Sequence, residues 1–109
     1  MAVMNLNKEL FKKYVHDENK VVLVDYWAPW CVYCRRIAPA FSKIAEQYAD
    51  TLVIGQVNID EEQALAVKEQ IEVIPTLVLY KDGQALGSIV APESKAQIET
   101  FMKETLQIG

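Results

Sequence analysis

The chain has 109 residues, of which 51% are hydrophobic and 24% are charged, and its formal net charge is −4. This length suffices for a real core, so residues 1–109 are expected to form one domain. The acidic balance, with no run of Lys and Arg longer than two, gives no reason to expect nucleic-acid binding.

The N-terminal segment MAVMNLNKEL lacks the basic start and the apolar core of a signal peptide. No apolar run approaches the roughly 18 residues that cross a bilayer. We therefore expect a cytoplasmic protein that binds no membrane, and stable structural disulfides are uncommon in that compartment.

The first predicted element is a helix that Asn7 can cap. Its apolar residues share one face; they are Leu10, Phe11, Tyr14 and Val15. Next, VVLVDYW, residues 21–27, is β-branched and almost continuously apolar, which predicts a central strand buried on both faces.

A second helical pattern begins at Cys31. Its apolar residues recur at helical spacing; they are Ile37, Phe41, Ile44 and Tyr48. Pro39 lies inside this pattern and predicts a kink.

The segment TLVIGQVNI, 51–59, predicts the next strand. Asp60 and Gln63 form a potential capping box for a helix that reaches about Glu69. The segment IPTLVLY, 74–80, is then predicted to be a strand that begins at a proline.

The Asp-Gly pair in KDGQ, 81–84, is typical of a hairpin turn that leads into a last strand at about 85–90. Pro92 and Glu93 are expected to open a final helix. The inner face of that helix is apolar; it comprises Ile98, Phe101, Met102 and Leu106. This order of elements predicts an α/β protein with a mixed sheet and helices on both faces.

The stretch WAPWCVYCRR, 27–36, contains the only two cysteines of the chain, Cys31 and Cys34. Such a pair can be half of a metal site, a structural feature or a reactive dithiol. A structural zinc site needs four ligands, whereas this chain offers two cysteines and one histidine, so we predict no metal site within one chain. The histidine, His16, is expected to be solvated near a helix end.

The position of the pair favours redox chemistry. Cys31 falls where a strand ends and a helix begins, and the free N–H groups and the dipole there stabilise a thiolate. Cys34 lies on the same helix face, so it can attack a mixed disulfide that Cys31 has formed. We expect it to be less exposed than Cys31 and harder to ionise. Two cysteines that merely pack at a helix start are the alternative.

Asp25 lies in the middle of the apolar strand at 21–27. A buried carboxylate is costly unless it is paired or protonated, so desolvation should raise its pKa towards neutrality, where a proton acceptor works best. Its place six residues before Cys31 indicates a position beneath Cys34, as the base of that thiol. The alternative is a hydrogen-bonded structural aspartate at a strand end.

Together, Asp25, the WCVYC segment and the later Ile-Pro-Thr step resemble the thioredoxin family, and the resemblance extends almost end to end. It implies a single thioredoxin domain with a five-stranded mixed sheet flanked by four helices. It also implies reduction of disulfide-containing proteins through a redox-active Cys31–Cys34 disulfide, with no bound cofactor. A flavin-containing, NADPH-dependent thioredoxin reductase would restore the dithiol. A monomer is the plain expectation.

By the same resemblance, Cys31 is the nucleophile, Cys34 the resolving thiol and Asp25 its base. Ile74–Pro75 would be a cis peptide facing the sulfurs, and the backbone of Ile74 would pair with an extended substrate segment. From sequence alone, a proline that simply starts a strand is the alternative for Pro75.

Trp30 is interpreted as an exposed ring that shields the disulfide and contacts substrate, and Trp27 as a core residue. The family usually has Gly-Pro between the cysteines, where this chain has Val32 and Tyr33. A Tyr before the second cysteine resembles glutaredoxins, but Trp30 and Asp25 do not fit that family. We expect the dipeptide to shift the redox potential in the less reducing direction.

Two further positions depart from the family pattern. Gln56 stands where thioredoxins usually carry a lysine near the buried aspartate, so the pKa of Asp25 should rise further. Ala91 replaces a glycine on the substrate-facing loop, and its methyl group should narrow the range of partners. Neither change removes a catalytic group.

Protein-disulfide reduction is the leading interpretation, and three others stay open. One is a less reducing isomerase or a glutathione-linked oxidoreductase, which the inter-cysteine dipeptide favours and the lack of a signal peptide disfavours. Another is a binding module that uses the groove around Trp30, Ile74 and Ala91 without turnover, a role that needs neither cysteine. The last is a dimer that shares a metal or iron–sulfur centre between two CVYC motifs.

Overall fold

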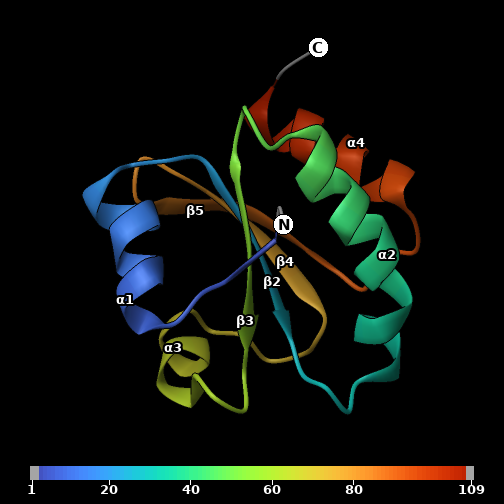
Figure 1. Cartoon of the computed structure of the whole chain (residues 1–109), viewed down its shortest axis with the longest axis horizontal. Helices are drawn as coiled ribbons and strands as arrows, with labels where there is room; N and C mark the ends of the chain where they lie inside the picture. The colour runs from blue at the N-terminus through green and yellow to red at the C-terminus, as the bar shows by residue number, and fades with distance from the viewer. Residues whose placement is uncertain (1–2, 108–109) are drawn as a thin grey trace.

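A computed structural model describes residues 3–107, which form a five-stranded sheet between two groups of helices (Figure 1). The strands are β1 (Met4–Asn5), β2 (Val22–Trp27), β3 (Val53–Asn58), β4 (Thr76–Lys81) and β5 (Gln84–Val90). The helical segments are α1 (Lys8–Phe11), its π-helical continuation η1 (Lys12–Asp17), α2 (Val32–Gln47), α3 (Gln63–Lys68) and α4 (Lys95–Leu106). None of the helices in the described range is long and apolar enough to cross a bilayer.

The sheet is mixed, in the order β1-β3-β2-β4-β5. β1, β3 and β2 run parallel, whereas β4 pairs antiparallel with β2 and β5. β2 is therefore the central strand, as the continuous apolar run predicted. The β4–β5 hairpin turns at Asp82 and Gly83, whose φ angles of 54° and 78° are those of the predicted tight turn. This is the five-stranded mixed sheet with four helices that the resemblance implied.

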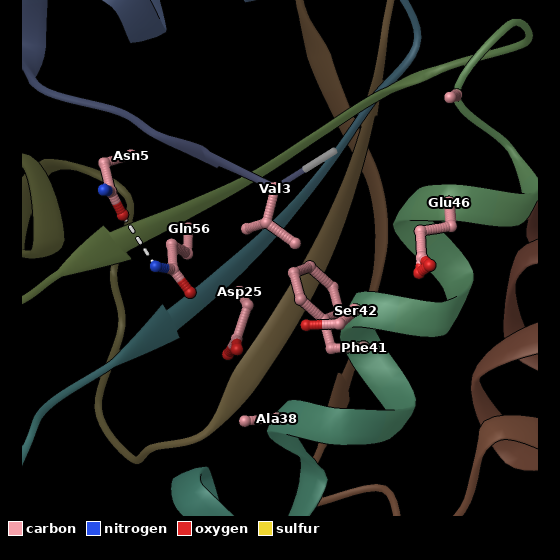
Figure 2. A pocket seen from close by; sticks show the side chains of 9 residues that line it. Val3, Asn5, Asp25, Ala38, Phe41, Ser42, Glu46 and Gln56 are labelled. Carbon is pink, nitrogen blue, oxygen red and sulfur yellow. Dashed lines mark hydrogen bonds between the residues drawn. The ribbon is translucent and has the colours of Figure 1, made fainter. Parts of the chain in front are cut away.

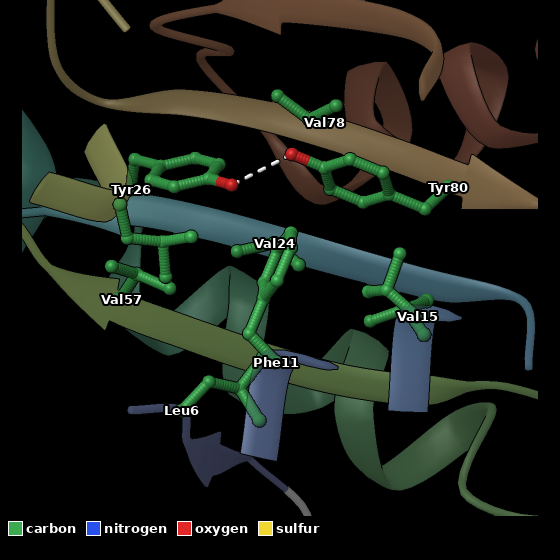
Figure 3. Close-up of a cluster of buried hydrophobic side chains, with 10 residues drawn as sticks. Leu6, Phe11, Val15, Val24, Tyr26, Val57, Val78 and Tyr80 are labelled. Atoms are coloured by element: carbon green, nitrogen blue, oxygen red, sulfur yellow. Dashed lines mark hydrogen bonds between the residues drawn. The ribbon is translucent and has the colours of Figure 1, made fainter. Parts of the chain in front are cut away.

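Alternation along β2 divides the core into two clusters, one on each face of the sheet. Val22, Val24 and Tyr26 face α1 and α3, and Figure 3 shows their cluster. Leu23 faces the opposite side, where α2 and α4 cover it. Because successive side chains of a strand point to opposite faces, Asp25 shares the α2 face with Leu23.

A buried chain of hydroxyl groups crosses the first of these clusters. The Tyr26 and Tyr80 hydroxyls lie 2.7 Å apart (Figure 3), and the Tyr80 hydroxyl donates to Glu69 Oε1 at 2.7 Å. Burial raises the pKa of both phenols well above the ordinary value, so both stay protonated. The sequence pattern did not predict this network, which ties the end of α3 to the sheet.

Asn7 caps the first helix as predicted, accepting a hydrogen bond from Leu10 N at 2.8 Å. The capping box predicted for α3 is wrong: the helix begins at Gln63, and no described side chain caps it. Asp60 is engaged elsewhere, because its carboxylate accepts the Trp30 indole N–H at 2.9 Å. Asn58 Oδ1 accepts Asp60 N at 2.9 Å and so holds the turn instead.

The final helix begins later than predicted, at Lys95, so Pro92 and Glu93 precede it. Ser94 is its N-cap, with Oγ accepting from Gln97 N at 3.1 Å. The Gln97 side chain in turn accepts from Glu93 N at 2.7 Å. A Ser followed three residues later by Gln is a better start signal than the proline, because both side chains satisfy free N–H groups.

Candidate active site

The two cysteines form a disulfide at the point where β2 passes into α2. Cys31 is the N-cap of α2, and its Sγ accepts a hydrogen bond from Cys34 N at 3.1 Å. Cys31 is 7% exposed and Cys34 3%, in the predicted order. The more exposed of the two cysteines is thus also the one at the N-terminus of the helix, where its Sγ accepts a helix N–H.

A small apolar cluster surrounds the disulfide. Ala28 and both cysteines form its buried part, and Trp27 and Ile74 pack against them. Trp27 is therefore partly buried rather than fully in the core, and within the described range its buried Nε1 has no hydrogen-bond partner. The packing of Ile74 brings residues more than forty positions apart in sequence together at the sulfurs.

The Ile74–Pro75 peptide is cis, and β4 begins only at Thr76. The prediction that the strand includes residues 74 and 75 is therefore wrong, since proline lacks an N–H for the ladder and the chain turns here. Thr76 Oγ1 donates to Val73 O at 2.6 Å, and Ala91 N donates to Pro75 O at 2.9 Å. The second of these bonds ties the proline step to the loop after β5.

The rim of the site is apolar and exposed. Trp30 is 63% exposed, as predicted for a ring that meets substrate, and the bond to Asp60 fixes its indole. Other large apolar side chains near the disulfide in the chain or beside the proline step are also exposed; they are Val32, Tyr33, Val73 and Val90. Exposed apolar groups gathered at one place are typical of a surface that binds a partner.

Tyr33 and Ala91 line the same pocket, of about 510 Å³, between the start of α2 and the loop after β5. The Arg36 guanidinium lies 5.1 Å from the centre of the Tyr33 ring. Both residues sit in the first two turns of α2, and Arg36 follows Cys34 by two residues in the sequence. We did not predict a role for Arg36, although its spacing of three residues from Tyr33 was a usable signal.

Ala91 has a φ of 46°, in the left-handed region that favours glycine. We predict that Ala91→Gly raises the free energy of unfolding by about 0.5–1 kcal/mol, because relief of the left-handed penalty exceeds the entropy cost of glycine. Urea unfolding of the oxidised protein measures this. Ala85→Gly, in β5 without a positive φ, is the matched control and should destabilise. Equal losses in both variants would contradict the prediction.

Asp25 is 4% exposed, and its side chain points towards α2 beside Ala38 (Figure 2). Ala38 follows Cys34 by one helical turn, so the carboxyl lies under the face of α2 that carries the second cysteine. Burial raises the pKa of Asp25 from 3.8 to about 7. In residues 3–107, its Oδ1 has no hydrogen-bond partner.

Gln56 is the neighbour of Asp25 in the β2–β3 register, but its amide nitrogen points away from the carboxyl, towards Asn5. Gln56 Nε2 donates to Asn5 Oδ1 at 2.6 Å (Figure 2). No cation therefore offsets the burial of Asp25 from this position, and its raised pKa has desolvation as its cause.

His16, which was expected to be solvated near a helix end, is exposed in η1, with its ring edge-on to Phe11 at 5.9 Å. Within the described part of the chain, no three His, Cys, Asp or Glu side chains are grouped as metal ligands would be.

The chain also matches known proteins over nearly all its length. The thioredoxin family model matches residues 2–104. Thioredoxin 1 of Synechococcus elongatus is 40% identical over 96 residues, which are 88% of this chain and 90% of that protein. The thioredoxin of Acidithiobacillus ferridurans is 39% identical over 105 residues, or 96% and 97% of the two chains. The chain belongs to the thioredoxin family, and its Cys31–Cys34 disulfide is the redox centre of a thiol–disulfide oxidoreductase.

Proposed function

We propose that this protein reduces the disulfides of other proteins. The Cys31 thiolate attacks one sulfur of a substrate disulfide, whose S–S bond breaks and releases one substrate thiolate. The Cys34 thiolate then attacks Cys31 Sγ, which releases the second substrate thiolate and forms the Cys31–Cys34 disulfide. Two electrons thus pass from this dithiol to the substrate. The observation that carries the proposal is the cysteine pair at the start of α2, packed against the cis-proline step.

Asp25 is proposed to accept the proton of Cys34 in the second step. Its carboxyl lies on the α2 side of the sheet, and a pKa of about 7 suits proton transfer at neutral pH. Gln56 tunes this group by leaving it without a compensating cation. A buried thiol is hard to ionise, so the resolving step is where a base has the most effect.

An extended substrate segment is proposed to lie across Trp30 and the Ile74–Pro75 step, with Ile74 pairing through its backbone. Ala91 borders the same surface and limits what docks there. The exposed apolar rim supports this placement, since a bound substrate segment would remove apolar side chains from water, which favours binding.

Recycling by a flavin-containing, NADPH-dependent thioredoxin reductase completes the proposed cycle. We further propose that residues 1–109 act as one domain and as a cytoplasmic monomer. No cofactor is then required beyond the disulfide itself.

A less reducing role, in disulfide isomerisation or glutathione-linked exchange, is the second candidate. It is favoured by Arg36, which follows Cys34 by two residues in α2 and lies against the Tyr33 ring. A positive charge stabilises a thiolate and so the reduced dithiol, which makes the couple less reducing.

The equilibrium redox potential of the Cys31–Cys34 pair, titrated in defined thiol–disulfide buffers, tests the function. As reference values for other proteins, thioredoxin lies at about −270 mV and protein disulfide isomerase at about −180 mV. We expect a value less reducing than the first but nearer to it than to the second. A value near the second would replace reduction with isomerase or glutathione-linked work, and a more reducing value would refute the effect of the dipeptide.

The double substitution Val32→Gly with Tyr33→Pro is the matched variant for this titration. It restores the usual family dipeptide and removes the ring that holds Arg36, so it should make the potential more reducing by about 30 mV or more, tenfold in the exchange constant. An unchanged potential would show that the dipeptide serves only partner binding.

A further inference from the structure

A second and larger pocket, of about 760 Å³, lies between the sheet and α2 (Figure 2). It does not include the disulfide or the rim around Trp30. Its lining comes from the N-terminal segment, β2, β3, one side of α2 and the turn after α2; the residues are Val3, Asn5, Asp25, Ala38, Phe41, Ser42, Glu46, Ala49 and Gln56.

The polar groups of this pocket include two carboxylates, and its only donors among the described lining side chains are the neutral groups of Asn5, Ser42 and Gln56. Asp25 is buried at its base, and none of the described residues donates to its Oδ1. Gln56 uses its Nε2 on Asn5, which leaves Oε1 facing Asp25 (Figure 2). Glu46 adds a second carboxylate, and among the described lining residues there is no Lys, Arg or His. A ligand that satisfies these groups must be rich in donors and positively charged.

The two carboxylates lie towards opposite ends of the pocket. Ala38, Ser42 and Glu46 recur every four residues, so they form one stripe along α2, and Ala49 lies in the turn that follows the helix. Asp25 lies beside Ala38, and Glu46 is eight residues further on, about 12 Å along the helix axis (Figure 2). Apolar side chains flank the space between the carboxylates; they are Val3 and Phe41.

We propose that this pocket binds a short linear aliphatic diamine, with one ammonium group on Asp25 and the other on Glu46. An ammonium group carries three donors and no acceptor, which complements an acceptor-rich lining. The methylene chain would lie against the apolar side chains between the two carboxylates.

The consequence for redox chemistry rests on the proposed function, whereas the binding itself does not. A bound ammonium favours the ionised form of Asp25. The bound diamine would therefore keep Asp25, the proposed base of Cys34, ionised, but it would also occupy one of the carboxylate oxygens. The rate of the resolving step would then depend on the concentration of diamine.

The test is an NMR titration of the oxidised protein with 1,4-diaminobutane. At pH about 8.5 Asp25, with its pKa of about 7, is almost fully ionised. We expect saturable shifts of the backbone amides of Ala38 and Ser42. The uncharged 1,4-butanediol, of similar length, should produce none at the same concentration.

Three variants locate the two ammonium groups. Asp25→Asn should weaken the binding about tenfold, because a buried charge-assisted hydrogen bond is lost. Glu46→Gln, at an exposed position, should weaken it about two- to fivefold. Glu104→Gln, an equal charge change on the exposed surface of α4, should leave the affinity unchanged.

Equal shifts with the diol would overturn the proposal, because apolar contact alone would then explain them. Equal weakening by all three substitutions would also overturn it, in favour of diffuse attraction to an acidic protein. The oxidised protein turns over no substrate in this titration, so its failure would leave the proposed reductase function untouched. Loss of that function would likewise leave the binding result standing.

Discussion

Cys34→Ser is expected to convert the protein into a trap for its own substrates. Cys31 keeps its place at the start of α2, so it still attacks a substrate disulfide, but the mixed disulfide has no neighbouring thiol to resolve it. Only external thiols can then release the substrate. Attack by Cys34 is intramolecular and so corresponds to a very high effective concentration of thiol. Because external thiols attack more slowly, turnover should fall at least ~100-fold. Non-reducing electrophoresis and mass spectrometry would detect the accumulated adduct.

Cys31→Ser is the matched control for this trap. Cys34 is the more buried of the two cysteines, and it lies inside the helix rather than at its cap. The control variant should therefore lose turnover and form almost no adduct. An adduct that forms on Cys34 as readily as on Cys31 would reverse the proposed roles, and undiminished turnover of Cys34→Ser would remove the need for a resolving thiol.

The parts of the site that could be predicted from sequence depend on short-range patterns. The continuous apolar run of β2 predicted both that the strand is central and that Asp25 is buried. Cys31 was recognisable as the start of a helix because helical spacing follows it. The Asp-Gly turn identified the hairpin for the same reason, since its backbone angles are a local property of Asp82 and Gly83.

Most of the features that were predicted wrongly or not predicted at all depend on contacts between residues distant in sequence. Asp60 was predicted to cap a helix, but its carboxylate instead accepts a hydrogen bond from the indole of Trp30, thirty positions earlier in the sequence. The bond of Tyr80 to Tyr26 joins residues 54 positions apart, and no local pattern announces it. The start of α4 is a different case, since the Ser94–Gln97 signal was local and was outweighed by the nearby proline.

The pocket under α2 could not be derived from sequence either. In its lining, Gln56 pairs with Asn5 of the neighbouring strand, and none of the described residues donates to Asp25 Oδ1. The resemblance identified Gln56 as an unusual residue at a position where the family usually has lysine, but it did not predict the direction of the Gln56 amide. Orientation of a polar side chain depends on which partner lies within reach, and that is known only once the sheet is assembled.

Asp25→Asn is expected to make the protein more stable, increasingly so as the pH rises from about 4 to about 8. The native pKa of Asp25 is raised from 3.8 to about 7 by burial. Between these values the native protein holds a proton that the unfolded chain releases, so the wild type loses about 1.4 kcal/mol of stability per pH unit from this group. The Asn side chain has a similar shape and carries no charge at any of these pH values.

The stability difference between variant and wild type should therefore grow by about 4 kcal/mol across this pH range and level off above pH ~8. Urea unfolding of both oxidised proteins at a series of pH values measures it. Asp50→Asn, at an exposed aspartate, is the matched control and should give a difference that hardly changes with pH. A flat difference for Asp25→Asn would mean that the carboxyl is ionised in the native state well below pH 7.

The same variant separates a structural aspartate from a base. If Asp25 only fills space, Asp25→Asn gains stability and resolves mixed disulfides at the wild-type rate. If it accepts the proton of Cys34, the gain in stability comes with a slower resolving step, by a factor of about 100 or more, and the wild-type rise in rate around pH 7 disappears. The buried carboxyl of Asp25 costs the fold several kcal/mol at neutral pH, and it nevertheless lies under the second cysteine. A role as the base of Cys34 explains this cost better than a purely structural role does.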